Sequence, residues 1–375
     1  MASIVRGTGD RRERRSFSAV IVGGGQSGLA MAHTLRQAGG RPVVLEAGSR
    51  PVGSWPTYYD GLTLFTPNAV NGLPGMAFPG RPDALPGRDD VVRYLDHYAA
   101  AMDIDVRTDH RVTRVRRDPE GFRVRTDDGV ELYGRSVIAA TGGSGSLPHR
   151  PEIPALRNFT GTVLHSVEYR SPAAFGGQRV VVVGSGNSAI QIAQELLDHA
   201  DVTMASRRPV KIWPGSESGL GTGFWRVFQA MSRVPLGHFA RHTPKTAGIP
   251  NVGGLREDVE SGRLERRPMF TQAEGHEIQW SDGTREHVDT VILATGFRPN
   301  LGYLDGIGAL RPDGWPLQRN GLSSALPGLA YVGLEEQRGW PTALFTAAYD
   351  ARHLAVRLPR VLRDAGRPLS PATRD

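Results

Sequence analysis

The segment from Ser18 to Glu46 constrains the fold more than any other part of the chain. It reads SAVIVGGGQSGLAMAHTLRQAGGRPVVLE, which is an apolar strand, a glycine turn, a helix and a second apolar strand. Gly23, Gly25 and Gly28 have the spacing GxGxxG: the first allows a tight turn, the second lets a pyrophosphate approach the backbone, and the third lets the helix pack on the strand. Glu46 ends the second strand, where a carboxylate accepts hydrogen bonds from ribose hydroxyls. The segment predicts a dinucleotide site.

The same pattern recurs in the middle of the chain. Residues 179–208 read RVVVVGSGNSAIQIAQELLDHADVTMASRR, with Gly184, Gly186 and Ala189 in the three small-residue positions. Two such units predict an α/β protein with two Rossmann-like dinucleotide-binding domains.

The two units differ at the end of the second strand. The residue as far from Gly184 as Glu46 is from Gly23 is Arg207, with Ser206 before it and Arg208 after it. Guanidinium groups and a hydroxyl pair with a ribose 2′-phosphate, which a carboxylate repels. The second site is therefore expected to bind NADPH, and the first a dinucleotide with a free 2′-hydroxyl. The alternative is that both arginines are solvated loop residues.

Two further apolar strands end in the same tripeptide. These are residues 136–142, ending in Ala140, Thr141 and Gly142, and residues 290–296, ending in Ala294, Thr295 and Gly296. Each follows alternating strands with an acidic turn, which is typical of a β-meander that leads back into a nucleotide domain. Alternatively, each is an ordinary buried strand with a glycine turn.

Composition narrows the function. The chain of 375 residues has no cysteine, which excludes disulfide scaffolds, Cys-based metal sites and thiol redox pairs. The formal charge is +7, but all basic residues except Lys211 and Lys245 are scattered arginines, so no nucleic-acid partner is expected. The basic head imitates a twin-arginine signal, yet the stretch behind it is the first dinucleotide motif. No run approaches the roughly 18 apolar residues of a membrane span. We expect a cytoplasmic protein without a metal site.

The residues before the second glycine motif carry a resemblance. Phe159, Gly161, His165 and Tyr169 match the fingerprint FxGxxxHxxx(Y/F), and with the two glycine motifs the chain resembles the class B flavoprotein monooxygenases of the flavin-containing monooxygenase type. Tyr169 stands where the Baeyer–Villiger branch has Trp. The resemblance covers nearly the full chain except residues 224–251. It implies FAD at the first site, NADPH at the second and a possible homodimer.

The resemblance also implies site residues. Trp55 and Thr66, in the loop after the first unit, are expected near the isoalloxazine ring. Relatives often have an Asn here that helps to hold the oxygenated flavin, and this chain has Pro67 followed by Asn68. Asn68 and His165 are the candidate catalytic residues, His165 with a hydrogen-bonding structural role as the favoured interpretation. The other expected cofactor contacts are Gln26, Ser27, Val112, Ser185, Asn187, Ser188 and Gly333, together with the two Thr-Gly pairs.

The expected architecture has an FAD-binding domain of residues 1–165 and 290–375, with an NADPH-binding domain of residues 166–289 inserted. A C-terminal helix from about Pro341 is expected to point its N-terminus at the flavin. The resemblance implies hydride transfer from NADPH to FAD, then oxygen transfer from a C4a-(hydro)peroxyflavin to a small substrate at a nitrogen or sulfur centre or an activated carbonyl. The alternatives are an NADPH:FAD reductase or oxidase that releases peroxide, and a flavin-binding redox regulator.

Overall fold

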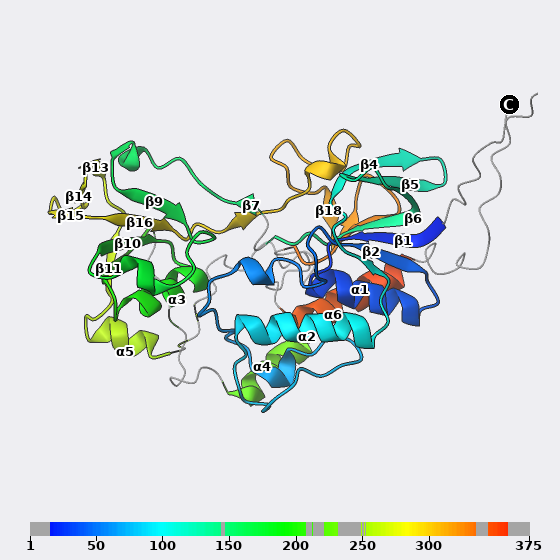
Figure 1. Ribbon diagram of the computed structural model, residues 1–375, viewed down its shortest axis with the longest axis horizontal. Coiled ribbons are helices and arrows are strands. Elements are labelled where there is room, and N and C mark those ends of the chain that lie inside the picture. Colours follow the sequence, from blue (N-terminus) through cyan, green and yellow to red (C-terminus); the bar gives the residue numbers. More distant parts are fainter. Residues whose placement is uncertain are drawn as a thin grey trace, which may run out of the picture.

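The computed structural model describes residues 16–143, 147–207, 212, 221–231, 249, 251, 253–334 and 344–358. These residues form two α/β lobes that lie side by side (Figure 1). Each lobe is built around a sheet whose central strands are parallel. The mixed α/β class and the two Rossmann-like domains predicted from the glycine motifs are confirmed.

The first lobe contains a nine-stranded sheet with the order β18-β19-β20-β6-β1-β2-β3, and β4 and β5 continue from β6 as an antiparallel meander. The strands are β1 (Ser16–Val22), β2 (Pro42–Leu45), β3 (Val106–Arg107), β4 (Val112–Asp118), β5 (Gly121–Thr126), β6 (Glu131–Ala139), β18 (Gln318–Arg319), β19 (Leu322–Ser323) and β20 (Leu329–Tyr331). The helices are α1 (Gln26–Gln37), α2 (Arg88–Ala101) and α6 (Ala347–Arg357).

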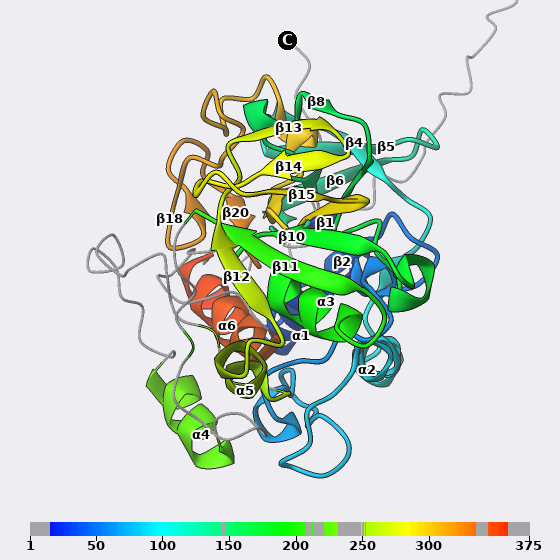
Figure 2. The ribbon, with the colours of Figure 1, turned by 90° about the vertical axis from the view of Figure 1, so that its left-hand side faces the viewer.

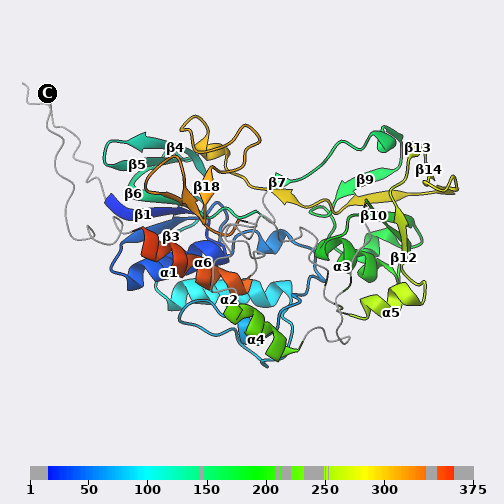
Figure 3. The same ribbon diagram turned by 180° about the vertical axis from the view of Figure 1, so that it is seen from behind.

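Strand β1 is apolar from Ala19 to Val22 because it is covered on both faces. Side chains alternate along a strand, so Ile21 packs among the residues of α1, α2 and α6, while Val20 packs with Phe122 and Val124 of the meander. Figure 3 shows the three helices together on one side of this sheet. Fully burying one such aliphatic side chain contributes about 1.5–3 kcal/mol, so the strand carrying the first glycine turn is firmly held.

The second lobe repeats this construction with a five-stranded parallel sheet of order β12-β11-β10-β16-β9, seen face-on in Figure 2. Val180 and Val182 of β10 pack toward α3, and Val181 and Val183 pack toward a four-stranded sheet of order β15-β14-β13-β8. The elements of this lobe are β8 (Asn158–Phe159), β9 (Thr162–His165), β10 (Arg179–Val183), β11 (Asp201–Ser206), β12 (Glu265–Pro268), β13 (Gln272–Gly275), β14 (Glu277–Gln279), β15 (Arg285–His287), β16 (Thr290–Leu293), α3 (Asn187–Leu196) and α5 (Leu255–Glu260).

Two of the segments that connect the lobes in the described part of the chain pair with each other. Strands β7 (Leu147–Pro148) and β17 (Phe297–Arg298) form a two-stranded antiparallel ribbon between the lobes (Figure 1). The expected boundaries, at residues 165 and 290, assign β9 and β16 to the FAD-binding domain, but both strands pair within the second sheet. The inserted domain therefore begins and ends at the ribbon of β7 and β17, and it includes β9 and β16. Pairing between distant parallel strands is not visible in a local sequence pattern.

The C-terminal helix begins later than expected. Pro341 lies outside the described residues, Leu344–Thr346 is a 3-10 turn, and α6 starts at Ala347. Asp350 already supplies a negative charge in the first turn of α6. This helix end therefore stabilises a second negative charge less than a helix end without an acidic residue would. Within the described part of the chain, no helix combines the length and apolarity needed to cross a bilayer.

Candidate functional site

The first glycine turn joins β1 to α1 and leaves no room for side chains at two positions. Gly23 has φ +109°, and a Cβ there would lie 2.6 Å from the carbonyl oxygen of Ala140. A Cβ on Gly28 would lie 1.9 Å from the carbonyl oxygen of Gly23. The turn and the close packing of helix on strand therefore both require glycine, in agreement with the spacing argument.

The middle glycine faces open space instead. A Cβ on Gly25 would meet no protein atom closer than the Cα of Gly53, at 3.6 Å. Helix α1 begins at the next residue with no acidic side chain in its first turn and no side-chain cap, so its backbone N–H groups point toward this space. Such a cradle fits the pyrophosphate of FAD, because an anion there accepts hydrogen bonds from the free N–H groups, and a side chain at Gly25 would displace the anion.

Glu46 is buried and holds the turn itself. Its Oε2 accepts a hydrogen bond from the backbone N–H of Gly24 at 2.6 Å, and its Oε1 accepts one from Gly48 at 2.8 Å. A carboxylate offers about four lone-pair positions, so each oxygen can accept one more hydrogen bond from a ribose hydroxyl. Val112 packs in the same apolar cluster as Leu45, immediately before Glu46.

The loop after β2 lies over the first glycine turn. The indole Nε1 of Trp55 donates a hydrogen bond to Oε1 of Gln26 at 2.9 Å. Ser27 lies close to Gly333, two residues after the end of β20, since a Cβ on Gly333 would lie 2.5 Å from the Oγ of Ser27. The structure therefore brings Gln26, Ser27, Trp55 and Gly333, all expected cofactor contacts, to the start of one helix.

Thr66 is engaged within its own loop. Its hydroxyl donates a hydrogen bond to Oδ1 of Asn71 at 2.7 Å, and Nδ2 of Asn71 donates back to the carbonyl oxygen of Thr66 at 2.8 Å. Both side chains are buried. Sequence analysis did not identify Asn71, and its position five residues after Thr66 gave no signal, since the contact depends on the folded loop.

Asn68 is buried and only half satisfied. Its Nδ2 donates a hydrogen bond to the carbonyl oxygen of Arg81 at 3.0 Å, while its Oδ1 has no hydrogen-bond partner among the described residues. A buried acceptor without a partner costs free energy. The Oδ1 atom is thus able to accept a hydrogen bond from a bound molecule or a water, and one of the two Nδ2 hydrogens is engaged by the loop.

Helix α4 (Thr222–Met231), in the stretch that the resemblance does not cover, packs on this loop. The ring of Trp225 lies 5.7 Å from that of Phe65, and Nε2 of Gln229 donates a hydrogen bond to the carbonyl oxygen of Val70 at 2.9 Å. The helix therefore shields the segment that contains Thr66 and Asn68.

The second glycine turn is built like the first. A Cβ on Gly184 would lie 2.5 Å from the carbonyl oxygen of Ala294, as a Cβ on Gly23 would from Ala140. A Cβ on Gly186 would meet nothing within 4 Å. Ser185 and Asn187 beside it are exposed, and α3 starts without an acidic residue or a side-chain cap. The Ala-Thr-Gly tripeptides thus lie against the first glycine of each motif, and the second turn fits a second pyrophosphate.

The end of β11 carries positive charge. Ser206 is the last residue of the strand and Arg207 follows it on the surface, whereas Arg208 lies outside the described residues. The pKa of the His149 imidazole is lowered by burial and by the charges of Arg298 and Arg207. Nε of Arg298 donates a hydrogen bond to Nδ1 of His149 at 3.1 Å. Arg298, which sequence analysis did not single out, therefore adds a second cation near Arg207.

His165 has both ring nitrogens engaged by backbone groups. Its Nε2 donates to the carbonyl oxygen of Gly296 at 3.0 Å, and its Nδ1 accepts from the N–H of Val167 at 3.2 Å. Burial lowers the pKa of this imidazole, and the side chain is fully buried. The neutral ring has no free nitrogen to take a proton from a substrate. It ties β9 to the Thr295–Gly296 turn, where the Thr295 hydroxyl donates to the carbonyl oxygen of His149.

Thr141 is the equivalent of Thr295 in the first lobe, and its hydroxyl is likewise bonded to a backbone carbonyl oxygen. Its hydroxyl donates to the carbonyl oxygen of Asn300 at 3.0 Å and lies 3.3 Å from the hydroxyl of Tyr303. Gly142 follows with φ +73°. The backbone turn after each tripeptide is therefore positioned by its threonine.

A polar network joins the loop after β2 to α3. The Tyr59 hydroxyl donates a hydrogen bond to Oε1 of Gln191 at 2.9 Å and also contacts Ser188, in the first turn of α3. Nε2 of Gln191 donates to the carbonyl oxygen of Thr63 at 2.8 Å. Of these residues only Ser188 was predicted from the sequence, because the partners come from opposite lobes.

Comparison with known proteins agrees with this geometry. Residues 20–216 match the pyridine nucleotide-disulphide oxidoreductase family. The indole-3-pyruvate monooxygenase YUCCA1 of Oryza sativa subsp. japonica is 33% identical over 324 residues, 78% of this chain and 79% of the relative. An uncharacterised CzcO-like oxidoreductase of Geobacillus kaustophilus is 28% identical, over 85% of this chain and 91% of the relative.

Solved structures extend the likeness to the fold. A flavin-containing monooxygenase from Stenotrophomonas maltophilia superimposes with a TM-score of 0.80 at 30% identity, over 92% of this chain and 98% of that chain. A cyclohexanone monooxygenase shares the fold with a TM-score of 0.67 at 16% identity, over 93% of this chain and 88% of that chain. With two glycine turns built for dinucleotides and relatives that span its length, this chain belongs to the class B flavoprotein monooxygenases, oxidoreductases that bind FAD and NADPH.

Proposed function

We propose that this chain takes electrons from NADPH and transfers one atom of O2 to a small organic substrate, with water as the second product. The observation that carries the proposal is the pair of equivalent glycine turns, one with a buried carboxylate at Glu46 and the other with a cation at Arg207. Bound FAD would supply the hydride acceptor and the reaction with O2, and the chain supplies binding, orientation and exclusion of water.

Particular residues carry these tasks. Gly25 and the start of α1 hold the FAD pyrophosphate, and Glu46 the adenosine ribose. Gly186 and the start of α3 hold the pyrophosphate of NADPH, with Arg207 at its 2′-phosphate. The Tyr59 network fixes α3 against the flavin-side loop, so that coenzyme and flavin keep one relative position.

A 2-oxo acid is the first substrate class to test. The rice relative at 33% identity is named an indole-3-pyruvate monooxygenase, and a 2-oxo acid offers an activated carbonyl. Amines and thioethers, which offer nucleophilic nitrogen and sulfur centres, form the second class.

The test is a comparison of NADPH consumption with peroxide release in the FAD-loaded protein. Indole-3-pyruvate, other 2-oxo acids, amines and thioethers are each added, and the oxygenated product is identified by mass spectrometry with ¹⁸O2. A substrate is expected to raise NADPH consumption, lower peroxide release and take up one labelled oxygen atom. NADPH turnover that yields stoichiometric peroxide with every compound, without labelled product, would contradict the proposal.

One observation favours a peroxide-releasing oxidase as the second candidate. One of the two Nδ2 hydrogens of Asn68 is bonded to the carbonyl oxygen of Arg81, so only the other could serve a flavin-bound oxygen. The variant Asn68→Ala separates the two functions. An oxygenase that depends on Asn68 would release more peroxide per NADPH after the change, whereas an oxidase would show the same ratio.

A further inference from the structure

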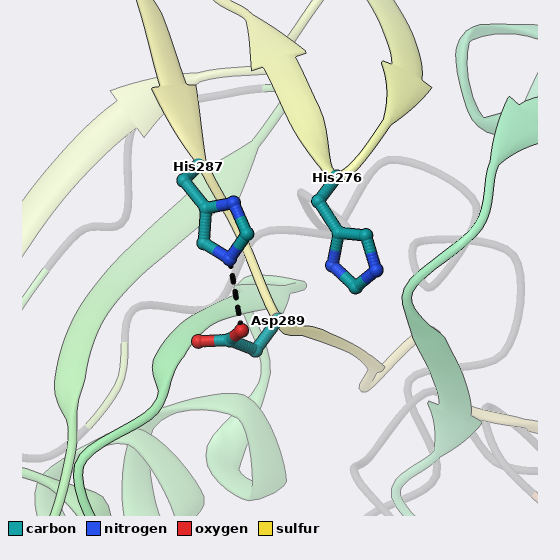
Figure 4. A group of neighbouring side chains, drawn as sticks. All are labelled: His276, His287 and Asp289. Carbon is teal, nitrogen blue, oxygen red and sulfur yellow. Dashed lines mark hydrogen bonds and ion pairs between the residues drawn. The ribbon is translucent and has the colours of Figure 1, made fainter.

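Three potential metal ligands meet at the far edge of the second lobe, away from both glycine turns. His276 lies between β13 and β14, His287 ends β15, and Asp289 immediately precedes β16. Figure 4 shows the three side chains turned toward a common region, and one donor atom from each lies within 4.8 Å of the others. The two histidines are exposed and Asp289 is half-buried, so a cation can reach all three.

The β14–β15 hairpin brings the histidines together. His287 pairs with Glu277 across the hairpin, and the N–H of Val288 donates to the carbonyl oxygen of His276 at 2.7 Å. The two imidazole rings consequently lie nearly parallel, with centroids 5.2 Å apart. A helical spacing such as HExxH does not describe this pair, because the two residues are eleven positions apart and meet through strand pairing.

The carboxylate is held in place by the backbone of a third strand. Oδ2 of Asp289 accepts a hydrogen bond from the N–H of Arg179 at 2.8 Å, and the N–H of Asp289 donates to the carbonyl oxygen of Arg179 at 2.9 Å. Its Oδ1 faces Nε2 of His287 at 3.0 Å. One oxygen is therefore structural, and the other is directed at the imidazole pair.

We propose that His276, His287 and Asp289 bind one divalent transition-metal cation of the Zn²⁺ type. Two imidazole nitrogens and one carboxylate oxygen suit Zn²⁺, Ni²⁺ or Cu²⁺, whereas Mg²⁺ and Ca²⁺ prefer oxygen ligands alone. Zn–N and Zn–O distances of about 2.0–2.2 Å place tetrahedral donors roughly 3.3–3.5 Å apart. Rotation of the exposed histidine side chains closes the remaining distance, and solvent fills the open position.

The contacts that binding replaces are weak. Nδ1 of His276 makes only a 3.3 Å contact with the carbonyl oxygen of Val288, and the contact between His287 and Asp289 is solvent-exposed. Exposed pairs of this kind contribute little to stability. A cation in the cluster would thus exchange two minor contacts for three metal–ligand bonds.

The position of the cluster predicts its effect. Asp289 and Arg179 stand at the starts of the parallel strands β16 and β10, and the glycine turn at Gly184 follows the other end of β10. A bound cation would join the hairpin to the parallel sheet without touching the turn expected to hold the coenzyme. The metal is therefore expected to change the stability of the protein rather than its coenzyme affinity.

The experiment is a titration of the tag-free, FAD-loaded, EDTA-treated full chain with ZnCl2, followed by calorimetry and by thermal unfolding. One Zn²⁺ per chain and a rise in Tm are expected, since a ligand that binds the folded state stabilises it. His287→Ala and Asp289→Asn should each weaken Zn²⁺ binding at least about 10-fold. Asp289→Asn keeps an acceptor oxygen for Arg179, so its metal-free Tm should stay close to that of the parent.

Two controls make the result decisive. His97→Ala removes an exposed histidine of α2, outside the cluster, and this variant should bind Zn²⁺ like the parent chain. A titration of the parent chain with MgCl2 should give no saturable heat. The proposal is overturned by the absence of saturable Zn²⁺ binding. It is equally overturned if His276→Ala, His287→Ala and Asp289→Asn all keep the parent affinity and stoichiometry, because the cation then binds elsewhere.

Discussion

The hydroxyl of Tyr169 donates a hydrogen bond to Oε2 of Glu195 at 2.9 Å. Tyr169 is the last residue of the fingerprint and is fully buried, while Glu195 belongs to α3. Gly61, from the loop of the other lobe, approaches the same carboxylate so closely that a Cβ there would lie 2.4 Å from Oε1. One carboxylate thus joins the fingerprint, α3 and the loop after β2.

Removing the Tyr169 hydroxyl should destabilise the protein. Tyr169→Phe deprives the carboxylate of its donor, at a cost of about 0.5–1.5 kcal/mol, whereas Glu195→Gln keeps an acceptor oxygen and should cost less. The free energy of unfolding of the FAD-loaded protein in urea measures both changes. A double-mutant cycle of Tyr169→Phe with Glu195→Ala, which removes the acceptor, should give a coupling energy of the same sign, and additive effects in that cycle would show that the hydrogen bond contributes nothing.

The carboxyl group of Glu195 is expected to make the stability of the protein depend on pH. Burial raises the pKa of Glu195 above its ordinary value of 4.5, and the nearby Asp60 charge adds to the shift. Between the ordinary and the raised pKa the folded chain binds more protons than the unfolded chain, so the free energy of unfolding contributed by this group falls as pH rises. The parent should therefore lose stability relative to Glu195→Gln as pH increases from about 4.5, measured by urea unfolding at several pH values. A difference in the free energy of unfolding between the two proteins that stays constant with pH would refute this role of Glu195.

The first glycine motif separates folding from cofactor binding. Gly28→Ala places a Cβ 1.9 Å from the carbonyl oxygen of Gly23 and should prevent stable folding. The Cβ of Gly25→Val would meet only the Cα of Gly53, at 3.6 Å, so the variant should fold, but without retaining FAD, because the side chain fills the pyrophosphate position. Circular dichroism reports the fold and absorbance near the flavin band reports retention. A yellow, fully loaded Gly25→Val protein would show that the flavin binds elsewhere.

The second glycine motif offers a matched control for the variants Gly28→Ala and Gly25→Val. Gly186→Ala meets nothing within 4 Å, so the variant should fold and keep FAD while its KM for NADPH rises. Loss of flavin from Gly186→Ala would mean that the two sites are not independent.

The parts of the site that follow from local sequence were predictable, and those that follow from tertiary contacts were not. The glycine turns at Gly23 and Gly184 are set by backbone conformation, which the residue type reveals. The placement of β9 and β16 depends on strand pairing across more than a hundred residues. The partners of Tyr59 and Thr66 likewise depend on how loops pack, which no spacing rule records.

Coenzyme choice gives the last prediction. Arg207 follows the final residue of β11 and is exposed, and it has no ion pair among the described residues. If it binds the 2′-phosphate of NADPH, Arg207→Ala loses a hydrogen bond to a charged group, about 1.5–3 kcal/mol, and the KM for NADPH should rise ~10- to ~100-fold. The KM for NADH should stay nearly constant, because NADH lacks that phosphate.

The value of kcat at saturating NADPH distinguishes coenzyme binding from a general disturbance of the lobe. The 2′-phosphate is remote from the transferred hydride, so its contact stabilises ground and transition states equally, and Arg207→Ala should leave kcat nearly unchanged. Arg319→Ala removes an exposed arginine of β18 in the other lobe and controls for the loss of one positive charge at matched salt. If Arg207→Ala and Arg319→Ala shift the two KM values alike, Arg207 acts only through surface charge, and selection of NADPH must come from other residues.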